Sequence, residues 1–398
     1  MLLKALVSWF LISGALLVAY SRRELVATWR EPVLRRPVLI IESDDWGAGP
    51  TSQSGVLQEI LELLASHSDR DGRQPVMTLG IILATADGGR FDADGSYQRR
   101  SISEAAYRPL LEVINKGVET GVFSVQLHGL EHFWPPALMA ASEHNEAVRA
   151  WLSKAPSAAS EDLPSALQSR WVDASVLPAK PLSKTALTEA ARREVGVFQS
   201  VFSVVPRVAV PPTFIWNRDV EKAWAVEGVS VIVTPGRRCE TRDQQGRPAG
   251  AGPRLYNGQA GESGIVYLVR DVYFEPSLGH TAEQALGALA AKVRLSRPAL
   301  FETHRFNFLG TEGDKDRALA ELERLLQMAL KSYPQLAFVS SENLAGTLRV
   351  GDPDWLERRF WPRLHVCLTR LGEFSRLRKL SWLTGWIVPA ALLWRLTA

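Results

Sequence analysis

The chain of 398 residues is long enough for one large α/β domain or two domains of ordinary size. Apolar residues make up 46% of it, which excludes a mainly disordered protein. The net charge of +3 is small and gives no indication of a nucleic-acid partner. The two cysteines, Cys239 and Cys367, are far apart and lack CxxC spacing, so they predict neither a disulfide framework nor a thiolate metal site.

The N-terminus carries an uncharged run at 5–21, after Lys4 and before Arg22 and Arg23. The run is near the lower limit of about 17 residues for a spanning helix, and it also fits the middle of a signal peptide. We interpret 1–24 as an uncleaved membrane anchor, with a cleaved signal as the alternative. Because the arginines that follow outnumber Lys4, the positive-inside rule predicts a cytoplasmic main domain, and a cleaved signal would reverse this.

Residues 37–350 alternate short apolar runs with amphipathic stretches. Strands are predicted at 38–41, 76–83, 123–127, 207–210, 229–233, 265–269, 299–303 and 337–340. Helices are predicted at 54–66, 104–119, 137–152, 184–203, 218–227, 281–295 and 314–332, with loops at 84–102 and between 152 and 184. This order predicts an α/β fold, a distorted (β/α) barrel of seven or eight mostly parallel strands.

The last segment, 351–398, is basic and rich in Trp and Leu. It ends with an uncharged run, 380–394, that Pro389 interrupts. This run is short for a membrane span. We expect a basic helix and an apolar tail that lie in a membrane interface, and a helix packed back on the barrel is the alternative.

Two adjacent acids, Asp44 and Asp45, follow the first apolar run. Neighbouring side chains on a regular strand point to opposite faces, so both acids serve one site only if the strand stops there. Gly47, Gly49 and Pro50 are predicted to supply that stop. Taken alone, the pair is more typical of a solvated turn or a helix N-cap.

Three of the seven histidines also follow predicted strands, namely His128, His132 and His304. In a barrel of parallel strands the carboxyl ends open on one face, where the active site lies. His128 and His132 are four residues apart, which on a helical turn places two imidazoles on a common side. With a carboxylate they complete a three-ligand set typical of a catalytic metal site.

The series resembles the metal-dependent polysaccharide deacetylases of the NodB homology class over about 37–345. That family carries an Asp-Asp motif, a His-x-x-x-His motif, a Pro-rich motif and a late strand-end His, in this order. The matching stretches are 43–46 for the first motif, 128–132 for the second, 210–213 in part for the third, and 302–304 for the last.

The resemblance implies a role for each matching residue. Asp45, His128 and His132 would hold a divalent ion, with zinc as the expected metal, Asp44 would be the general base and His304 the general acid. The implied reaction is hydrolysis of an N-acetyl group on a polysaccharide or a lipid-linked glycan. An ion that acidifies water and polarises the acetyl carbonyl, next to a carboxylate base, is consistent with that chemistry.

The third motif departs from the family pattern, because Val210 stands where an arginine usually braces the catalytic Asp. Arg207, Arg270 and Arg305 are the candidates to replace that arginine, and Arg270-Asp271 is the preferred pair. The full set expected behind the ligands or on the substrate is Trp46, Glu131, Pro211, Pro212, Arg270, Asp271, Glu275 and Arg305. Trp46, Trp134 and Trp216 are candidate platforms for sugar rings, with core packing as the alternative. Glu42 is expected to point away from the pocket or to cap a loop.

Two other functions remain open at this point. His128-x-x-Glu131-His132 has the spacing of the inverted zinc-peptidase motif, in which Glu131 would be the general base. That motif needs a continuous helix, which Gly129 and the prolines after Trp134 argue against. The second alternative is a catalytically silent glycan-binding barrel at the membrane.

Overall fold

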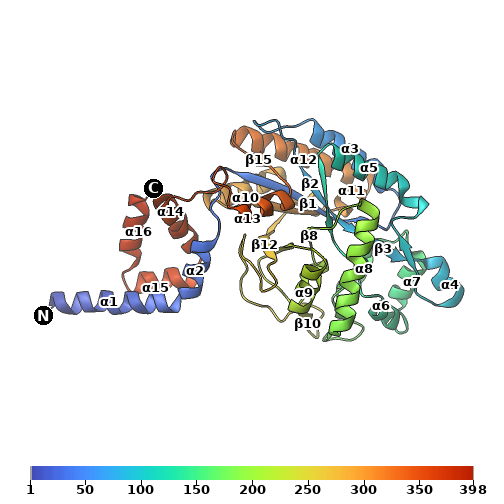
Figure 1. Cartoon of the computed structure of the whole chain (residues 1–398), viewed down its shortest axis with the longest axis horizontal. Coiled ribbons are helices and arrows are strands. Elements are labelled where there is room, and N and C mark those ends of the chain that lie inside the picture. The colour runs from blue at the N-terminus through green and yellow to red at the C-terminus, as the bar shows by residue number, and fades with distance from the viewer. Residues whose placement is uncertain (1, 398) are drawn as a thin grey trace.

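A curled parallel sheet forms the centre of the protein, whose structure is a computed structural model that describes residues 2–397 (Figure 1). Its hydrogen-bonded order is β12 (Val266–Val269), β9 (Val231–Thr234), β8 (Val208–Ala209), β5 (Phe123–Leu127), β2 (Met77–Ile82), β1 (Val38–Gly47), β14 (Ala299–His304) and β13 (Val272–Tyr273), with β15 (Ala337–Phe338) paired to the start of β1. Every pairing in this sheet is parallel. All residues of β1 are buried, as expected for a central strand covered on both faces.

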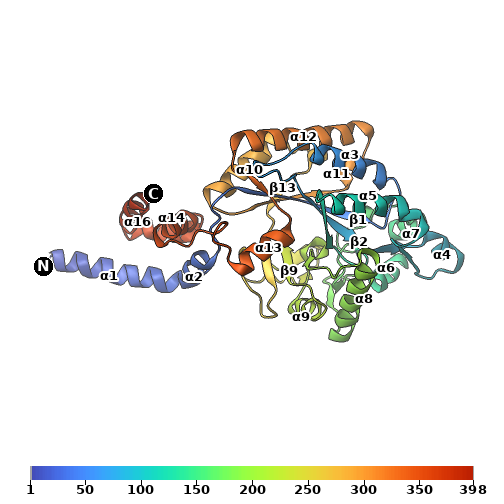
Figure 2. The same ribbon diagram turned by 45° about the horizontal axis from the view of Figure 1, so that its top comes forward.

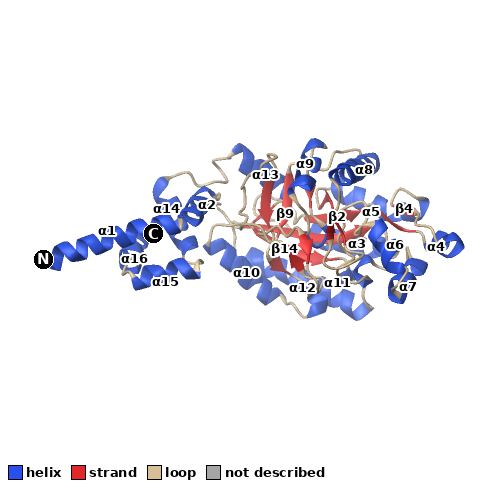
Figure 3. Ribbon diagram, turned by 90° about the horizontal axis from the view of Figure 1, so that it is seen from below, coloured by secondary structure: helices blue, strands red, loops and turns tan. Residues whose placement is uncertain are grey.

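The two ends of the sheet meet through the chain itself. Only Arg270 and Asp271 separate β12 from β13, and the segment 266–273 pairs with β9 on one side and with β14 on the other. The sheet therefore curls round into a distorted barrel, which confirms the predicted fold class (Figure 3).

Helices cover the outside of the sheet (Figure 2). They are α3 (Gln53–Ala65), α5 (Arg108–Glu119), α8 (Lys184–Phe202), α9 (Arg218–Val226), α10 (Ala282–Arg294), α11 (Phe306–Leu309), α12 (Glu312–Ser332) and α13 (Ser341–Val350). Each of the longer ones buries an apolar stripe, such as Leu322, Leu325 and Leu326 of α12. The helix expected at 137–152 is two, α6 (Pro135–Ser142) and α7 (Glu146–Lys154), because the Asn145 side chain accepts a hydrogen bond from Val148 N and starts a new helix.

Three loops contain small ordered elements. The segment 84–102 holds β3 (Ala84–Ala86), α4 (Gly88–Asp94) and β4 (Arg99–Ser101), and later loops hold β6 (Val172–Asp173) with β7 (Lys180–Pro181) and β10 (Thr241–Arg242) with β11 (Pro248–Ala249). Short 3-10 turns lie at Ala105–Tyr107, Ser160–Asp162, Pro212–Phe214 and Pro276–Leu278. These antiparallel ladders of two or three residues have too few alternating apolar positions to be recognised in the sequence.

The two ends of the chain form a separate group of helices beside the barrel (Figure 1). The group consists of α1 (Leu2–Tyr20), α2 (Arg22–Arg30), α14 (Phe360–Leu371), α15 (Ser375–Leu383) and α16 (Ile387–Leu396). Among residues 2–397, one helix is long and apolar enough to cross a membrane, at Leu3–Tyr20 with mean hydropathy 1.8. Its length and composition fit either a membrane anchor or a signal sequence.

Candidate active site

A β-bulge places the acid pair at the carboxyl end of β1. Ser43 pairs with Leu79 and Trp46 with Ile81, so β1 has one residue more than β2 between these positions. Asp45 has φ 72°, in the left-handed region that non-glycine residues avoid. The expectation that β1 stops at the acids is wrong, since the strand continues to Gly47. The bulge, and not a strand end, brings both carboxylates to one cleft.

Gly80 of β2 provides the space that the bulge needs. A Cβ added there would overlap Asp44 Oδ1 and lie 3.2 Å from the Asp44 Cα. Any larger residue therefore has to displace both the carboxylate and the backbone of β1. The sequence analysis did not single out this glycine, because only the pairing register shows what faces it.

Asp45, His128 and His132 form the first cluster of potential metal ligands. The Nε2 atoms of both histidines lie 3.3 Å from Asp45 Oδ1, and all three residues are buried. His128 Nδ1 donates a hydrogen bond of 2.9 Å to the Val210 carbonyl, which leaves Nε2 as the free lone pair. The histidines lie in the loop after β5, with Gly129 at φ 111°, and not on the helical turn that we expected.

The protonation states of His132 and Asp45 suit a cation, whereas Asp44 and Asp45 raise the pKa of His128 against the effect of burial. Burial lowers the pKa of His132 to about 4, so that the ring is neutral and offers a lone pair at neutral pH. Burial works against the charge on Asp45, but the neighbouring His132 and His128 outweigh it and hold the pKa of that carboxyl well below its usual range. Asp45 Oδ1 is buried without a hydrogen-bond partner among the described residues. Two imidazoles and a carboxylate fit a divalent ion such as Zn²⁺.

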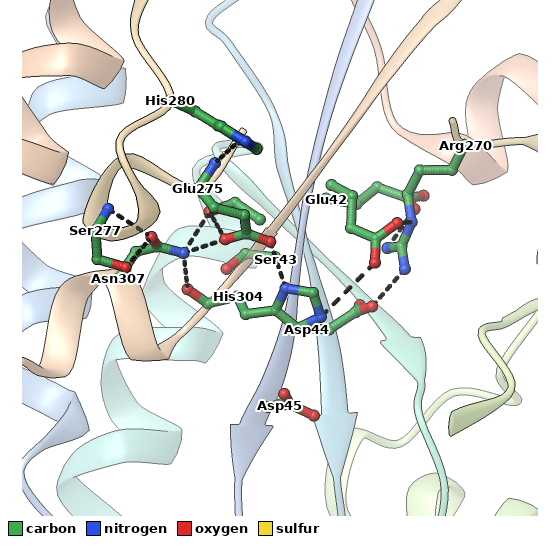
Figure 4. A network of polar contacts seen from close by, with 12 residues as sticks. Glu42, Ser43, Asp44, Asp45, Arg270, Glu275, Ser277, His280, His304 and Asn307 are labelled. Carbon is green, nitrogen blue, oxygen red and sulfur yellow. Dashed lines mark hydrogen bonds and ion pairs between the residues drawn. The ribbon is translucent and has the colours of Figure 1, made fainter. Parts of the chain in front are cut away.

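Arg270 is the brace of Asp44 that the third motif lacks (Figure 4). Its Nη2 lies 2.5 Å from Asp44 Oδ2, its Nη1 lies 2.9 Å from Glu42 Oε2, and its Nε lies 3.3 Å from Glu302 Oε2. The short gap between β12 and β13 directs this side chain into the barrel. Arg270 of the preferred pair therefore contacts Asp44 directly.

The other expected partners of Asp44 lie elsewhere. Arg207 is exposed, and the Arg305 side chain makes two hydrogen bonds to Glu161, of 3.1 and 2.8 Å. Asp271 does not pair with Arg270 beside the site, because its carboxylate lies 2.5 Å from Lys292 Nζ at the surface. Of the three candidate arginines, only Arg270 contacts Asp44.

One guanidinium serves three buried carboxylates here, so the site carries excess negative charge. Burial raises the pKa of Glu42 and brings that of Glu302 to about 7. For Asp44 the effect of burial is overcome by Arg270 and His128, and its pKa stays below the usual range. Asp44 is therefore ionised at neutral pH, while Glu302 titrates near neutral pH.

Glu42 has a different place from the one expected. It is fully buried below the cleft, where it accepts hydrogen bonds from Arg270 and from Ser341 at the start of α13. The parallel register sets Glu42 beside Glu302, and Asp44 beside His304. Glu42 thus positions Arg270 and also accepts a hydrogen bond at the start of α13. The expected capping role covers only the second of these contacts.

His304 faces Asp44 from the neighbouring strand (Figure 4). Its Nδ1 donates a 2.6 Å hydrogen bond to Glu275 Oε1, and Asn307 donates to the other oxygen of that carboxylate. Burial disfavours the charged ring, but the bond to Glu275 and the charge of Asp45 outweigh it and raise the pKa of His304 to about 10. Glu275 therefore lies behind the histidine, keeps it protonated and does not line the cleft.

The cleft above these residues has a volume of about 200 Å³. It is lined by Asp44, Asp45, His128, His132, Glu161, Gln168, Val210, Pro211, Thr213, Phe214, Arg270, Glu302, His304 and Phe306. Pro211 borders the cleft as predicted, whereas Pro212 lies under it, against Gly129. Glu161 and Gln168 are not among the predicted residues, because the segment between 152 and 184 is predicted only as a loop without a recognisable motif.

The three tryptophans expected as platforms for sugar rings do not line the cleft. Trp46 Nε1 donates to Ser43 Oγ and Trp216 Nε1 to Glu221, so neither ring is available to a sugar. Trp134 is half-buried and does not line the cleft.

Glu131 is also buried, and its carboxylate binds Arg170, Arg99 and Tyr97. No helix contains both histidines of its motif, since α6 begins only at Pro135. Glu131 is therefore not placed to act as the base of an inverted zinc-peptidase motif.

The comparisons with known proteins concern the structure alone, since no protein-family model and no curated protein sequence matches the chain. It is similar to a family 4 carbohydrate esterase from Streptomyces lividans (12% identity, TM-score 0.35, 76% of this chain and 92% of that one). It is also similar to a CE4 family pseudoenzyme from Bacillus anthracis (10%, 0.36, 78% and 66%) and to a 4-alpha-glucanotransferase from Thermococcus litoralis (8%, 0.40, 87% and 46%). At these TM-scores the likeness does not assign a function.

Proposed function

We propose that the protein is a metal-dependent hydrolase that removes the acetyl group from an N-acetylated glycan. One observation carries the proposal: the buried set Asp45, His128 and His132 lies in the same cleft as a braced carboxylate, Asp44, and a protonated imidazole, His304. The motif order found in the sequence supports the same reaction. Zinc is the metal that this donor set suits.

The five residues divide the work of amide hydrolysis. An ion held by Asp45, His128 and His132 supplies Lewis-acid activation of water and of the acetyl carbonyl. Asp44 Oδ1 is buried without a hydrogen-bond partner among the described residues, while Arg270 holds Oδ2, so Oδ1 is free to take the proton from the attacking water. As the carbon–nitrogen bond breaks, His304 gives its proton to the leaving nitrogen, and the products are acetate and a free amine.

The test measures metal content and acetate release on the purified full-length protein. We expect about one divalent ion per chain and equal amounts of acetate and new amine from N-acetylated oligosaccharides or lipid-linked N-acetyl sugars. A metal-loaded protein that binds these glycans without releasing acetate would support the silent glycan-binding alternative. Cleavage of peptides instead of N-acetyl groups would support the peptidase.

His128→Ala should lose both the ion and the activity, because it removes a ligand whose orientation the Val210 carbonyl fixes. The measurement is metal content after dialysis together with turnover at saturating metal. Glu59→Gln, at a half-buried ion pair with Lys315 outside the cleft, is the control that should retain both. Full metal content in the His128 variant would remove this residue from the ligand set.

The activity should depend on pH through His304. Its pKa is raised to about 10 by Glu275, so the acid form persists through neutral pH and is lost only as the pH rises through that value. Glu275→Gln removes the negative charge that stabilises the imidazolium, and the pKa falls. The alkaline limb of the kcat/KM profile should therefore move to lower pH, by about one unit or more.

Asp271→Asn is the matched control, since it removes a nearby acid that pairs with Lys292. Its profile should coincide with that of the unaltered protein. An alkaline limb that stays in place in the Glu275 variant would mean that His304 is not the acid.

A further inference from the structure

The first helix of the chain packs against the last two. The Trp386 ring lies edge-on to Phe10 with centroids 5.9 Å apart, and its Nε1 donates to the Phe10 carbonyl at 3.1 Å. A Cβ on Gly14 would come within 2.5 Å of the same ring, so the Trp386 ring can pack here only because Gly14 has no side chain. Trp9 Nε1 donates in return to the Thr384 carbonyl at 3.3 Å. α1 is therefore part of a tertiary structure that needs the C-terminal segment.

A buried arginine ties this helical group to the barrel. Arg370 of α14 is fully buried. It donates hydrogen bonds to the carbonyl of Glu31, which follows α2, and to the carbonyl of Ser296, which lies between α10 and β14 of the barrel. Arg297 lies beside it, paired with Glu31 at 2.8 Å and with Glu373 at 2.6 Å. Charged groups buried with this many partners fix the position of α14 and α2 on the barrel.

The outer surface of the group is apolar. Its large exposed side chains include Leu3, Leu6, Val7, Trp9, Leu11, Ile12, Leu16 and Val18 of α1, and Trp361, Trp382, Leu383, Val388, Leu392 and Leu396 of the C-terminal helices. Between α1, α14, α15 and α16 lies an apolar groove of about 670 Å³. An exposed apolar surface of this extent marks a contact with a membrane or a partner.

The charges around this surface favour a membrane. Exposed basic residues gather where α1 ends and along α15, namely Arg22, Arg23, Arg30, Arg376, Arg378 and Lys379. The segments 1–23 and 374–398 contain no acidic residue. Basic residues that border an apolar surface complement the headgroups of anionic lipids, each contributing about 1 kcal/mol near the membrane. A protein partner would not require this segregation of charge.

We infer that α1 stays on the mature chain and forms with α14–α16 one membrane module that sits in an anionic lipid bilayer. The 19 residues of α1 span about 28 Å, close to the hydrocarbon thickness of about 30 Å. The ten residues of α16 reach about 15 Å and do not cross. The C-terminal helices pack along the half of α1 nearer the barrel, and they occupy the leaflet next to it (Figure 1).

This module holds the cleft away from the bilayer. Residues 31–37 connect α2 to the amino end of β1, whereas Asp44 lies about 20 Å further along that strand. The site therefore opens at the end of the barrel that is remote from the module. To reach it, the acetyl group of a lipid-linked glycan has to extend at least this distance, about 20 Å, from the membrane surface.

The test begins with the N-terminus and the membrane affinity of the full chain, purified through a C-terminal tag from membranes. Intact mass should show that the residues of α1 are retained, and a chain that begins near Arg22 would overturn the inference. The protein should float with vesicles of phosphatidylcholine plus phosphatidylglycerol, and with phosphatidylcholine alone more weakly. Failure to float with either, or equal flotation with both, would contradict the anionic bilayer.

A matched pair of tryptophan variants tests the packing. Trp386→Ala removes the contact with α1, and limited proteolysis of the C-terminal helices in vesicles should become about tenfold faster. Trp386→Phe should restore most of the protection. Trp382→Ala removes an indole of α15 that is 71% exposed, and the rate of proteolysis should stay at that of the unaltered protein. Equal rates in the two alanine variants would show that α1 and the tail do not pack together. Acetate release tests the proposed reaction separately.

Discussion

Asp44→Asn should keep the metal and lose the activity. Asparagine has the same size and still offers an oxygen to Arg270, but its amide cannot accept the proton of water. The three ligands are untouched, so metal content should remain at the level of the unaltered protein. Loss of a general base lowers the rate by about 10²- to 10⁴-fold, and kcat/KM measured by acetate release should fall within that range.

The comparison with Glu131→Gln decides between the two hydrolytic reactions. Glu131 is held by Arg170 at 2.6 Å and lies outside the cleft, so its loss should lower stability and leave the activity per folded molecule near that of the unaltered protein. An active Asp44 variant together with an inactive, folded Glu131 variant would replace the deacetylase with a peptidase.

Spacing and strand order were sufficient to find the residues that carry the proposed chemistry. Asp45, His128, His132 and His304 each follow an apolar run, and the fold brings the carboxyl ends of parallel strands to one edge. Arg270 is preferred because it too ends a strand, and it contacts Asp44. The convergence of these side chains depends on topology, which the alternation of strand and helix determines.

The supporting residues could not be predicted in the same way. The contact of Glu42 with Arg270 joins positions 228 apart in the chain, on segments that do not pair with each other. Glu161 reaches the cleft from a loop with no regular pattern, held there by Arg305. Expected platforms such as Trp46 are buried, because a local sequence does not distinguish a ring at the rim of the barrel from one in its core. Register, loop paths and burial are tertiary properties.

Gly80→Ala should inactivate the site without touching a proposed catalytic residue. The added methyl group overlaps Asp44 Oδ1 and lies 3.2 Å from its Cα, so the bulge of β1 has to move. Displacing a catalytic group by about 1 Å costs about 10²-fold in rate, and overpacking costs about 1–3 kcal/mol of unfolding free energy. We expect kcat/KM to fall by at least that factor, measured beside urea unfolding, which should show a cooperative, folded protein.

Gly196→Ala in α8 separates this effect from the general cost of an extra methyl group. An added Cβ there has no neighbour within 4 Å, and alanine in a helix interior should stabilise by about 1 kcal/mol with activity unchanged. If the Gly80 variant were as active as the unaltered protein, Asp44 would not need the geometry of the bulge. The proposed roles of Asp44 as base and Asp45 as metal ligand would then be contradicted. If it were inactive and folded, the space beside Asp44 would be a requirement of catalysis, set by a residue that has no side chain.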